Sequence, residues 1–227
     1  MLPALPLLAA LFAFGATASG AVRAAEAQSS APWRWGAGDP IVRHLVAMIE
    51  SSPGPCQALP PDHPQRRTIE DDVARFRAVV PEAAGVRFDV LDCYWDGLVD
   101  RGERVVLSAR LARATPAQRF FVIAHEFGHL ALGHHAALVD LVVGLLHHHE
   151  DVPAVVRAIA GNAAGALSRR HEAEADAFAT HATLLAGLDV EQAARFFEQN
   201  GLVLKTHPAP SARADAIRAF AAATIAP

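Results

Sequence analysis

Several features that would indicate other classes of protein are scarce or missing in this 227-residue sequence. It has only two cysteines, no internal repeat and a net charge of −4. Without a repeat, the chain is not expected to form a solenoid or a propeller. Because no stripe of basic residues runs along the sequence, nothing in it indicates a nucleic-acid partner.

Long apolar runs are also absent after the N-terminal region. Residues 134–146 are too few to cross a bilayer and include Asp140, and residues 152–167 carry Arg157 and Asn162. A membrane-spanning helix needs about 20 apolar residues in succession. We therefore expect no transmembrane domain once the N-terminal segment has been removed.

The N-terminus, in contrast, has a nearly uninterrupted apolar run at residues 2–14, followed by small residues with several A-x-A-like sites. This pattern is typical of a secretory signal peptide. It predicts a signal peptide at residues 1–24, a flexible lead-in at residues 25–38, and a single domain at residues 39–227 in the periplasm or outside the cell. No Lys or Arg precedes the apolar run, so an uncleaved anchor is the alternative.

The two cysteines fit an exported protein. In an oxidising compartment, Cys56 and Cys93 can form one disulfide. It would tie a proline-rich loop at residues 52–64 to the segment before residue 104. Two unpaired buried thiols are the alternative.

Residues 125–129 read His-Glu-Phe-Gly-His within a stretch expected to be one helix. Two histidines four residues apart lie on the same helix face, so both imidazoles can reach one metal ion. In zinc peptidases of this pattern, His125 and His129 would bind Zn²⁺ and Glu126 would act as the general base. A chance match to H-E-x-x-H is the alternative.

The sequence around this motif predicts a buried helix. Thr115 and Gln118 can form a capping box, with Pro116 at the first helical position. Apolar residues then follow at helical spacing around nearly the whole circumference. Gly128 costs about 1 kcal/mol relative to Ala inside a helix. A close neighbour, such as another backbone or a substrate, would explain this glycine.

Residues 171–176, His-Glu-Ala-Glu-Ala-Asp, offer the third protein ligand that a catalytic zinc site usually has. Glu172 and Asp176 share a helix face. One of them can therefore bind zinc while the other accepts a hydrogen bond from a ligating imidazole and fixes its tautomer. Glu174 points elsewhere and is expected to be solvated. An ordinary acidic helix face is the alternative.

Together, H-E-x-x-H and the downstream E-x-x-A-D resemble the gluzincin metallopeptidases that include the CAAX prenyl proteases, the HtpX-type membrane proteases and periplasmic proteases of outer-membrane quality control. The resemblance covers about residues 85–220. It implies a zincin-like fold, one Zn²⁺ per chain, Glu172 as the third ligand and Asp176 as the partner of a ligating histidine. It also implies that a strand at residues 104–108 lies along the substrate cleft.

Thr206-His207-Pro208, with Arg213 six residues after the histidine, is similar to the C-terminal His-Pro…Arg element of the same family. The resemblance implies that His207 and Arg213 lie near the metal and stabilise the oxyanion. It also implies that His207 can occupy the open zinc position and keep the enzyme latent. A His-Pro turn without a function is the alternative for His207.

Elsewhere, apolar spacing predicts helices at residues 41–50, from Thr68 to about residue 80 and near residues 212–223, and a strand at residues 86–91. The expected fold is therefore mainly α with a small β-sheet (α+β). The histidine-rich segment at residues 147–151 is expected to be a solvated turn, with a second metal site as the alternative.

The predicted function is that of a zinc metalloendopeptidase that hydrolyses unfolded or misassembled exported proteins, with the substrate extended against residues 104–108. One alternative is a zinc peptidase that cleaves phage-type repressors, which residues 124–134 and 172–179 also resemble. The other is a zinc-stabilised binding or chaperone-like module without turnover. The intact Glu126 argues against that second alternative, because a structural site has no use for a general base.

Overall fold

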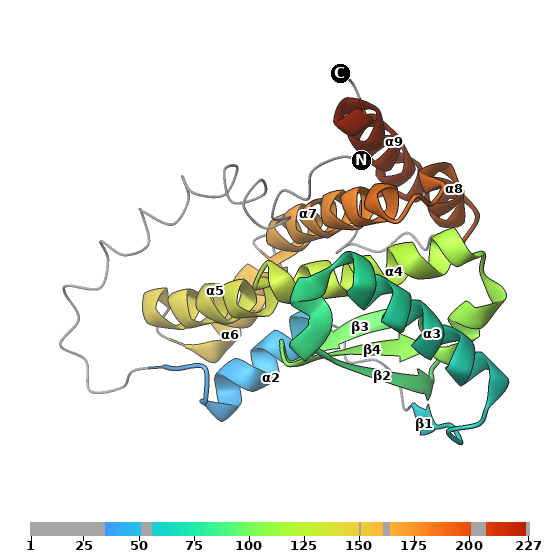
Figure 1. The fold of residues 1–227 in the computed structure, drawn as a ribbon. Coiled ribbons are helices and arrows are strands. Elements are labelled where there is room, and N and C mark those ends of the chain that lie inside the picture. Colours follow the sequence, from blue (N-terminus) through green and yellow to red (C-terminus); the bar gives the residue numbers. More distant parts are fainter. Residues whose placement is uncertain (1–34, 51–55, 150, 161–163, 201–207, 226–227) are drawn as a thin grey trace. The chain divides into compact units, whose positions relative to one another are not determined.

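The computed structural model describes residues 35–50, 56–149, 151–160, 164–200 and 208–225 (Figure 1). They all belong to the unit of the chain that begins at Trp35. The predicted signal peptide at residues 1–24 and the predicted site residue His207 lie outside the described residues.

Helices make up most of the described chain, and a four-stranded mixed sheet lies among them. The elements follow in this order: α2 (Pro40–Ile49), β1 (Gln57–Ala58), α3 (Pro64–Val79), η2 (Pro81–Gly85), β2 (Arg87–Asp92), β3 (Gly97–Asp100), β4 (Arg104–Ser108), η3 (Ala109–Arg113), α4 (Pro116–Ala131), α5 (His134–His148), α6 (Val152–Ala158), α7 (Ala164–Leu185), α8 (Val190–Asn200) and α9 (Pro210–Ile225). This composition confirms the expected α+β fold class.

The order of the strands in the sheet is β1-β2-β4-β3. Strand β4 pairs in parallel with β2, where Phe88 faces Val105, and antiparallel with β3, where Val99 faces Val105. Both edges of β4 are therefore occupied, and the expectation that a substrate adds to residues 104–108 is wrong. The sequence predicted β4 itself but not the short strand β3, which covers it and forms the edge of the sheet.

Helix α3 also differs from the prediction, since it begins at Pro64 rather than at Thr68. Proline suits the first helical position because its fixed φ is helical and its missing N–H would have no partner there. The hydroxyl of Thr68 donates to the carbonyl of Pro64, 3.1 Å away, inside the helix instead of capping it. The predicted helix at residues 41–50, the strand at 86–91 and the last helix match α2, β2 and α9 within a few residues.

Phenylalanine side chains join the sheet to the helices around it. The ring of Phe76 in α3 meets those of Phe88, Phe120 and Phe127 edge-on, at centroid distances of 5.4–6.2 Å, and Phe127 in turn meets Phe178 of α7 at 5.6 Å. Edge-to-face pairs are the favoured geometry for aromatic rings and add to the stabilisation from burial. Helix α4 thus lies in the middle, against the sheet and α3 and also against α7 (Figure 1).

A second apolar cluster forms where α2 packs on α5 and α6. Its most buried residues are Val42, Leu45, Val142 and Val155. No single helix in the described ranges is long and apolar enough to cross a membrane, whereas α4 and α5, which meet at a 45° bend, pass the same test of length and composition as a pair.

The predicted disulfide between Cys56 and Cys93 is confirmed, with Cα atoms 4.6 Å apart. It joins the residue before β1 to the residue after β2, so the two-residue strand β1 is held to the sheet by a covalent bond as well as by backbone pairing.

Replacing both cysteines by serine should lower the free energy of unfolding. For a sequence separation of 37 residues, the chain-entropy account gives a loss of about 3–4 kcal/mol. Urea unfolding of the double variant and of the oxidised wild-type protein measures the difference. An unchanged midpoint and slope would show that the disulfide does not stabilise the fold.

Candidate metal centre

Helix α4 carries His125, Glu126 and His129, and its start is firmly fixed. The hydroxyl of Thr115 accepts from the backbone N–H of Gln118, and the side chain of Gln118 accepts from the N–H of Thr115, so the predicted capping box is present. In the same first turn, Arg119 forms an ion pair with the buried carboxylate of Asp72 in α3. These contacts set the rotation of the helix, and with it the direction of the imidazoles two turns later.

Helix α7 brings Glu172 to the two histidines because it can approach α4 closely. A Cβ atom on Gly128 would lie 3.3 Å from the Cα atom of Ala175 and 3.4 Å from the Cβ atom of Phe178. A neighbouring backbone therefore explains this glycine, whose helix propensity is unfavourable. Ala175, three residues after Glu172, is fully buried at this crossing.

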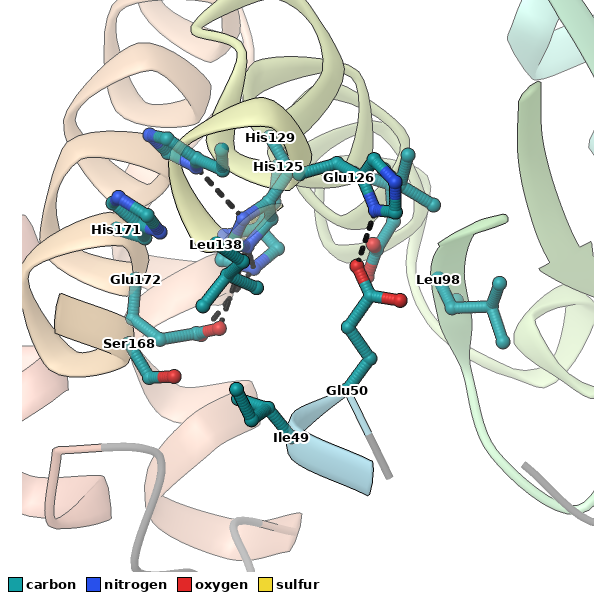
Figure 2. Close-up of a pocket in the computed structure, with 14 residues that line it drawn as sticks. Ile49, Glu50, Leu98, His125, Glu126, His129, Leu138, Ser168, His171 and Glu172 are labelled. Atoms are coloured by element: carbon teal, nitrogen blue, oxygen red, sulfur yellow. Dashed lines mark hydrogen bonds and ion pairs between the residues drawn. The ribbon is translucent and has the colours of Figure 1, made fainter. Parts of the chain in front are cut away.

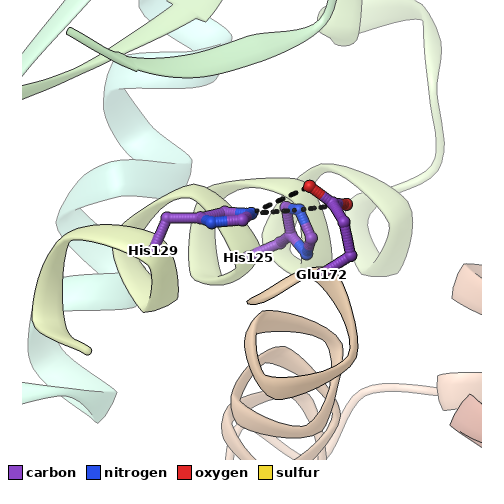
Figure 3. A group of neighbouring side chains, drawn as sticks. All are labelled: His125, His129 and Glu172. Carbon is purple, nitrogen blue, oxygen red and sulfur yellow. Dashed lines mark hydrogen bonds and ion pairs between the residues drawn. The ribbon is translucent and has the colours of Figure 1, made fainter. Parts of the chain in front are cut away.

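The three predicted ligand side chains converge at this crossing (Figure 3). The Nε2 atoms of His125 and His129 are 3.1 Å apart, and they lie 3.5 and 3.4 Å from the nearer oxygens of Glu172. In a tetrahedral zinc site with ligand bonds of 2.0–2.2 Å, donor atoms are about 3.3–3.6 Å apart. The two histidine–carboxylate distances fall within this range and the distance between the two Nε2 atoms lies just below it, so the arrangement and the chemistry of these donors fit a zinc ion.

Asp176 and Arg213 both contact His125, and Nη2 of Arg213 lies 3.1 Å from Nδ1 and 3.2 Å from Nε2 of its ring. An oxygen of Asp176 accepts from Nδ1 of His125 at 2.9 Å, and Arg213 binds both carboxylate oxygens of Asp176 at 2.6 and 2.7 Å. The guanidinium of Arg213 also lies over the ring of Phe197, 3.9 Å from its centroid. Arg213 is buried and comes near Glu172 at 3.5 Å, but it is not among the side chains that line the adjoining pocket.

The electrostatics of this group favour a cation between the histidines and the carboxylates. Burial and Arg213 lower the pKa of His125, but hydrogen bonds to Asp176 and Glu172 outweigh them and raise it to about 9. Burial disfavours the charged form of Glu172, yet hydrogen bonds from the two histidines hold its pKa well below the usual range. A metal ion bound here would meet the same attraction and would displace protons.

Glu126 lines the same pocket as the three candidate ligands (Figure 2). Burial, the largest effect, raises the pKa of Glu126, although His125 and His129 oppose the change. Strand β3 passes so close to this side chain that a Cβ atom on Gly97 would lie only 2.7 Å from Cγ of Glu126. Figure 2 shows Glu172 on one side of the pocket and Leu98 of β3 on the other.

The sequence interpretation gave no role to His134 and expected Glu174 to be solvated. In the structure, Nδ1 of His134 lies 2.9 Å from Nδ1 of His129, and Nε2 of His134 lies 3.1 Å from the carboxylate of Glu174. In the sequence, Gly133 could have indicated that the chain turns here and brings His134 next to His129. Its φ of 70° ends α4 in the left-handed region that glycine favours, and the next residue starts α5 beside the site.

The histidine-rich segment at the end of α5 stays apart from this centre. His147, His148 and His149 are exposed, and within the described ranges they join no group of three potential metal ligands.

Substituting Gly128 by alanine should weaken metal binding even though it favours the helix itself. Alanine is the better helix former, by about 1 kcal/mol, but its methyl group would push α7 away from α4 and move Glu172 from the histidines. We expect a lower zinc affinity in a chelator competition, whereas Gly144→Ala, in α5 with open space around it, should leave the affinity unchanged. Equal affinities in all three proteins would contradict this account of the crossing.

Comparison with known proteins gives a match that agrees with this geometry. No curated protein sequence matches the chain. A model of Peptidase family M48 matches residues 65–221, which is more than half of the chain and includes the capped helix α4 and the candidate ligands on α4 and α7. The chain therefore belongs to Peptidase family M48, a family of zinc metallopeptidases.

Proposed function

We propose that this metallopeptidase is a zinc-dependent endopeptidase that hydrolyses unfolded or misassembled proteins after export. The observation that carries the proposal is the meeting of His125, His129 and Glu172 at distances suited to a tetrahedral ion, with Glu126 in the same pocket. The fold, the charges and the family agree with one zinc ion per chain.

Zinc in this position would act as a Lewis acid that polarises the scissile carbonyl and lowers the pKa of a water molecule towards 7. The protein holds the acid–base group nearby. Glu126 accepts the proton of the attacking water and passes it to the leaving amine, and its partly buried position beside β3 keeps its carboxylate within the pocket.

The edge strand β3 is the place where an extended substrate would bind. Ser108 donates its N–H to the carbonyl of Asp96, the residue before β3. Because hydrogen-bonded and non-hydrogen-bonded pairs alternate in an antiparallel ladder, the backbone groups of Gly97 and Val99 point away from β4. A polypeptide can form backbone hydrogen bonds with these groups. Such binding recognises the backbone more than the side chains and therefore suits unfolded substrates.

Arg213 and His207 enter the proposal differently. The ion pair of Arg213 with Asp176 supports a role in holding the imidazole of His125, and this role needs no contact with the substrate. Stabilisation of the oxyanion by Arg213 or His207, and latency through His207, stay predictions.

The proposed location is the periplasm or the outside of the cell, and the proposed subgroup is that of the CAAX prenyl protease and HtpX-type enzymes. The apolar run at residues 2–14 supports export, and the Cys56–Cys93 disulfide supports an oxidising compartment. Both observations disfavour a cytoplasmic peptidase that cleaves phage-type repressors. The E-x-x-A-D motif at residues 172–176 supports the subgroup.

The first test is the degradation of casein by the zinc-loaded protein that starts after the signal peptide. Glu126→Gln should lower kcat by roughly 10²–10⁴-fold, the usual contribution of a general base, and should leave zinc bound. Glu70→Gln, on the exposed side of α3, serves as the control with full activity. Casein cleaved equally fast by Glu126→Gln would exclude Glu126 as the base.

If the zinc-loaded wild type does not cleave casein, His207→Ala is the next protein to make. Activity that appears in this variant would indicate latency through His207. If neither protein cleaves although zinc is bound, the non-catalytic binding module becomes the better account. If the wild type is active and His207→Ala hydrolyses casein at the same rate, both roles of His207 are excluded.

A proline in β3 tests the substrate strand. Val99→Pro removes an N–H that points away from β4, so the sheet should tolerate it, whereas the substrate loses one hydrogen bond. Such a bond contributes about 0.5–1.5 kcal/mol, which corresponds to a fall of about 2- to 13-fold in kcat/KM for unfolded polypeptide. Val99→Ala keeps the N–H and is the matched control. Equal kcat/KM values for the two variants would argue against pairing at β3.

A further inference from the structure

We propose that His134 and Glu174 are positioning residues that orient His129 towards the metal through a chain of two hydrogen bonds. The proposal rests on the zinc site described above and adds to it two residues that are not among its three candidate ligands. They act through the imidazole of His129 alone.

The three side chains lie in series. Nε2 of His129 faces Glu172 and His125, where the ion would be held, and Nδ1 of the same ring faces Nδ1 of His134 at 2.9 Å. On the far side of His134, Nε2 lies 3.1 Å from Oε2 of Glu174. Both contacts have ordinary hydrogen-bond lengths.

The donors and acceptors along this series can be assigned in only one direction when Nε2 of His129 binds a metal. That nitrogen then offers its lone pair to the ion, so the hydrogen of the neutral ring is on Nδ1 and is donated to Nδ1 of His134. His134 must accept at Nδ1, and its own hydrogen is therefore on Nε2 and is donated to Glu174. The carboxylate at the end thus fixes both tautomers.

Packing keeps His134 in this position. Its side chain is almost completely buried, and its ring stacks on that of His171 with the centroids 4.0 Å apart and the planes 3° from parallel. Glu174 is about half exposed and also lies 3.6 Å from Arg170, one turn earlier in α7. The relay therefore runs from the buried ligand to the surface of α7.

The two histidine ligands are thus oriented in two different ways. His125 donates directly to Asp176, which Arg213 binds in turn, whereas His129 reaches its carboxylate through a second imidazole. Partners of this kind strengthen a ligating imidazole and fix the direction of its lone pair.

A second metal ion between His134, His171 and Glu174 is the competing interpretation of the same cluster. The lone pair of an imidazole nitrogen lies in the ring plane. Because the rings of His134 and His171 are parallel and 4.0 Å apart, their lone pairs run side by side and do not converge on one ion. In addition, both nitrogens of His134 have hydrogen-bond partners.

The test is a measurement of zinc affinity by chelator competition for the wild-type protein, His134→Ala, Glu174→Gln and the double variant. His134→Ala should weaken zinc binding by roughly 10- to 100-fold, as is typical when the partner of a ligating histidine is lost. Glu174→Gln should weaken it less and in the same direction, because the exposed carboxylate acts only through His134. In the double variant, Glu174→Gln should add nothing to the loss caused by His134→Ala.

Glu50→Gln is the matched control. Glu50 accepts a hydrogen bond from Nδ1 of His135 at 2.6 Å, so it is also a carboxylate paired with a histidine at the same pocket, but its histidine contacts no candidate ligand. Its zinc affinity should equal that of the wild type. Urea unfolding of the zinc-free proteins separates positioning from stability, and Glu174→Gln should unfold like the wild type.

Two results would overturn the relay while the zinc site stands, namely wild-type affinity in Glu174→Gln or fully additive losses in the double variant. If His134→Ala fails to fold, Glu174→Gln alone decides. Zinc bound at two equivalents per wild-type chain, falling to one in His134→Ala, would instead establish the second metal site. A wild-type protein that binds no zinc would overturn the proposed function itself, and the relay with it.

Discussion

The site depends on how closely α7 can approach α4. The motif on α4 supplies two imidazoles, but the third candidate ligand, on another helix, reaches them only where the two backbones nearly touch, at Gly128 and Ala175. In a close-packed interior, even one added methyl group displaces its neighbours. The small residue on each helix at this crossing therefore sets the position of Glu172. The rings of Phe127 and Phe178 pack beside the crossing and fix the rotation of the two helices.

Orientation of the ligands adds a second constraint, because an imidazole binds a metal well only when its lone pair is aimed at the ion. Asp176 and Arg213 provide this for His125 with two charged groups that are both buried. Breaking such a pair leaves an uncompensated buried charge, whereas the pair itself contributes little net stability. The ion pair is therefore better understood as a device that fixes a geometry than as a source of folding free energy.

Local sequence was sufficient to predict what depends on local contacts. Short-range patterns predict the capping box at Thr115, the helix around His125 and the strand at residues 104–108. The disulfide partner of Cys56 follows because the sequence has a single other cysteine. The pairing of β3 with β4 could not be predicted, because register and strand order depend on contacts between segments. The contact of His134 with His129 was missed for the same reason, since it depends on a change of direction at Gly133.

The edge of the sheet and the metal centre are linked by one further glycine. Gly97 starts β3 where the strand passes over Glu126, and no side chain larger than hydrogen fits there without displacing that carboxylate. The same residue presents its backbone groups away from β4. A polypeptide paired with β3 would therefore run past Glu126, the proposed acid–base group, and the backbone register would position the scissile bond. Under the proposed function, selectivity for chains that can be extended would then follow from backbone pairing at the edge of the sheet.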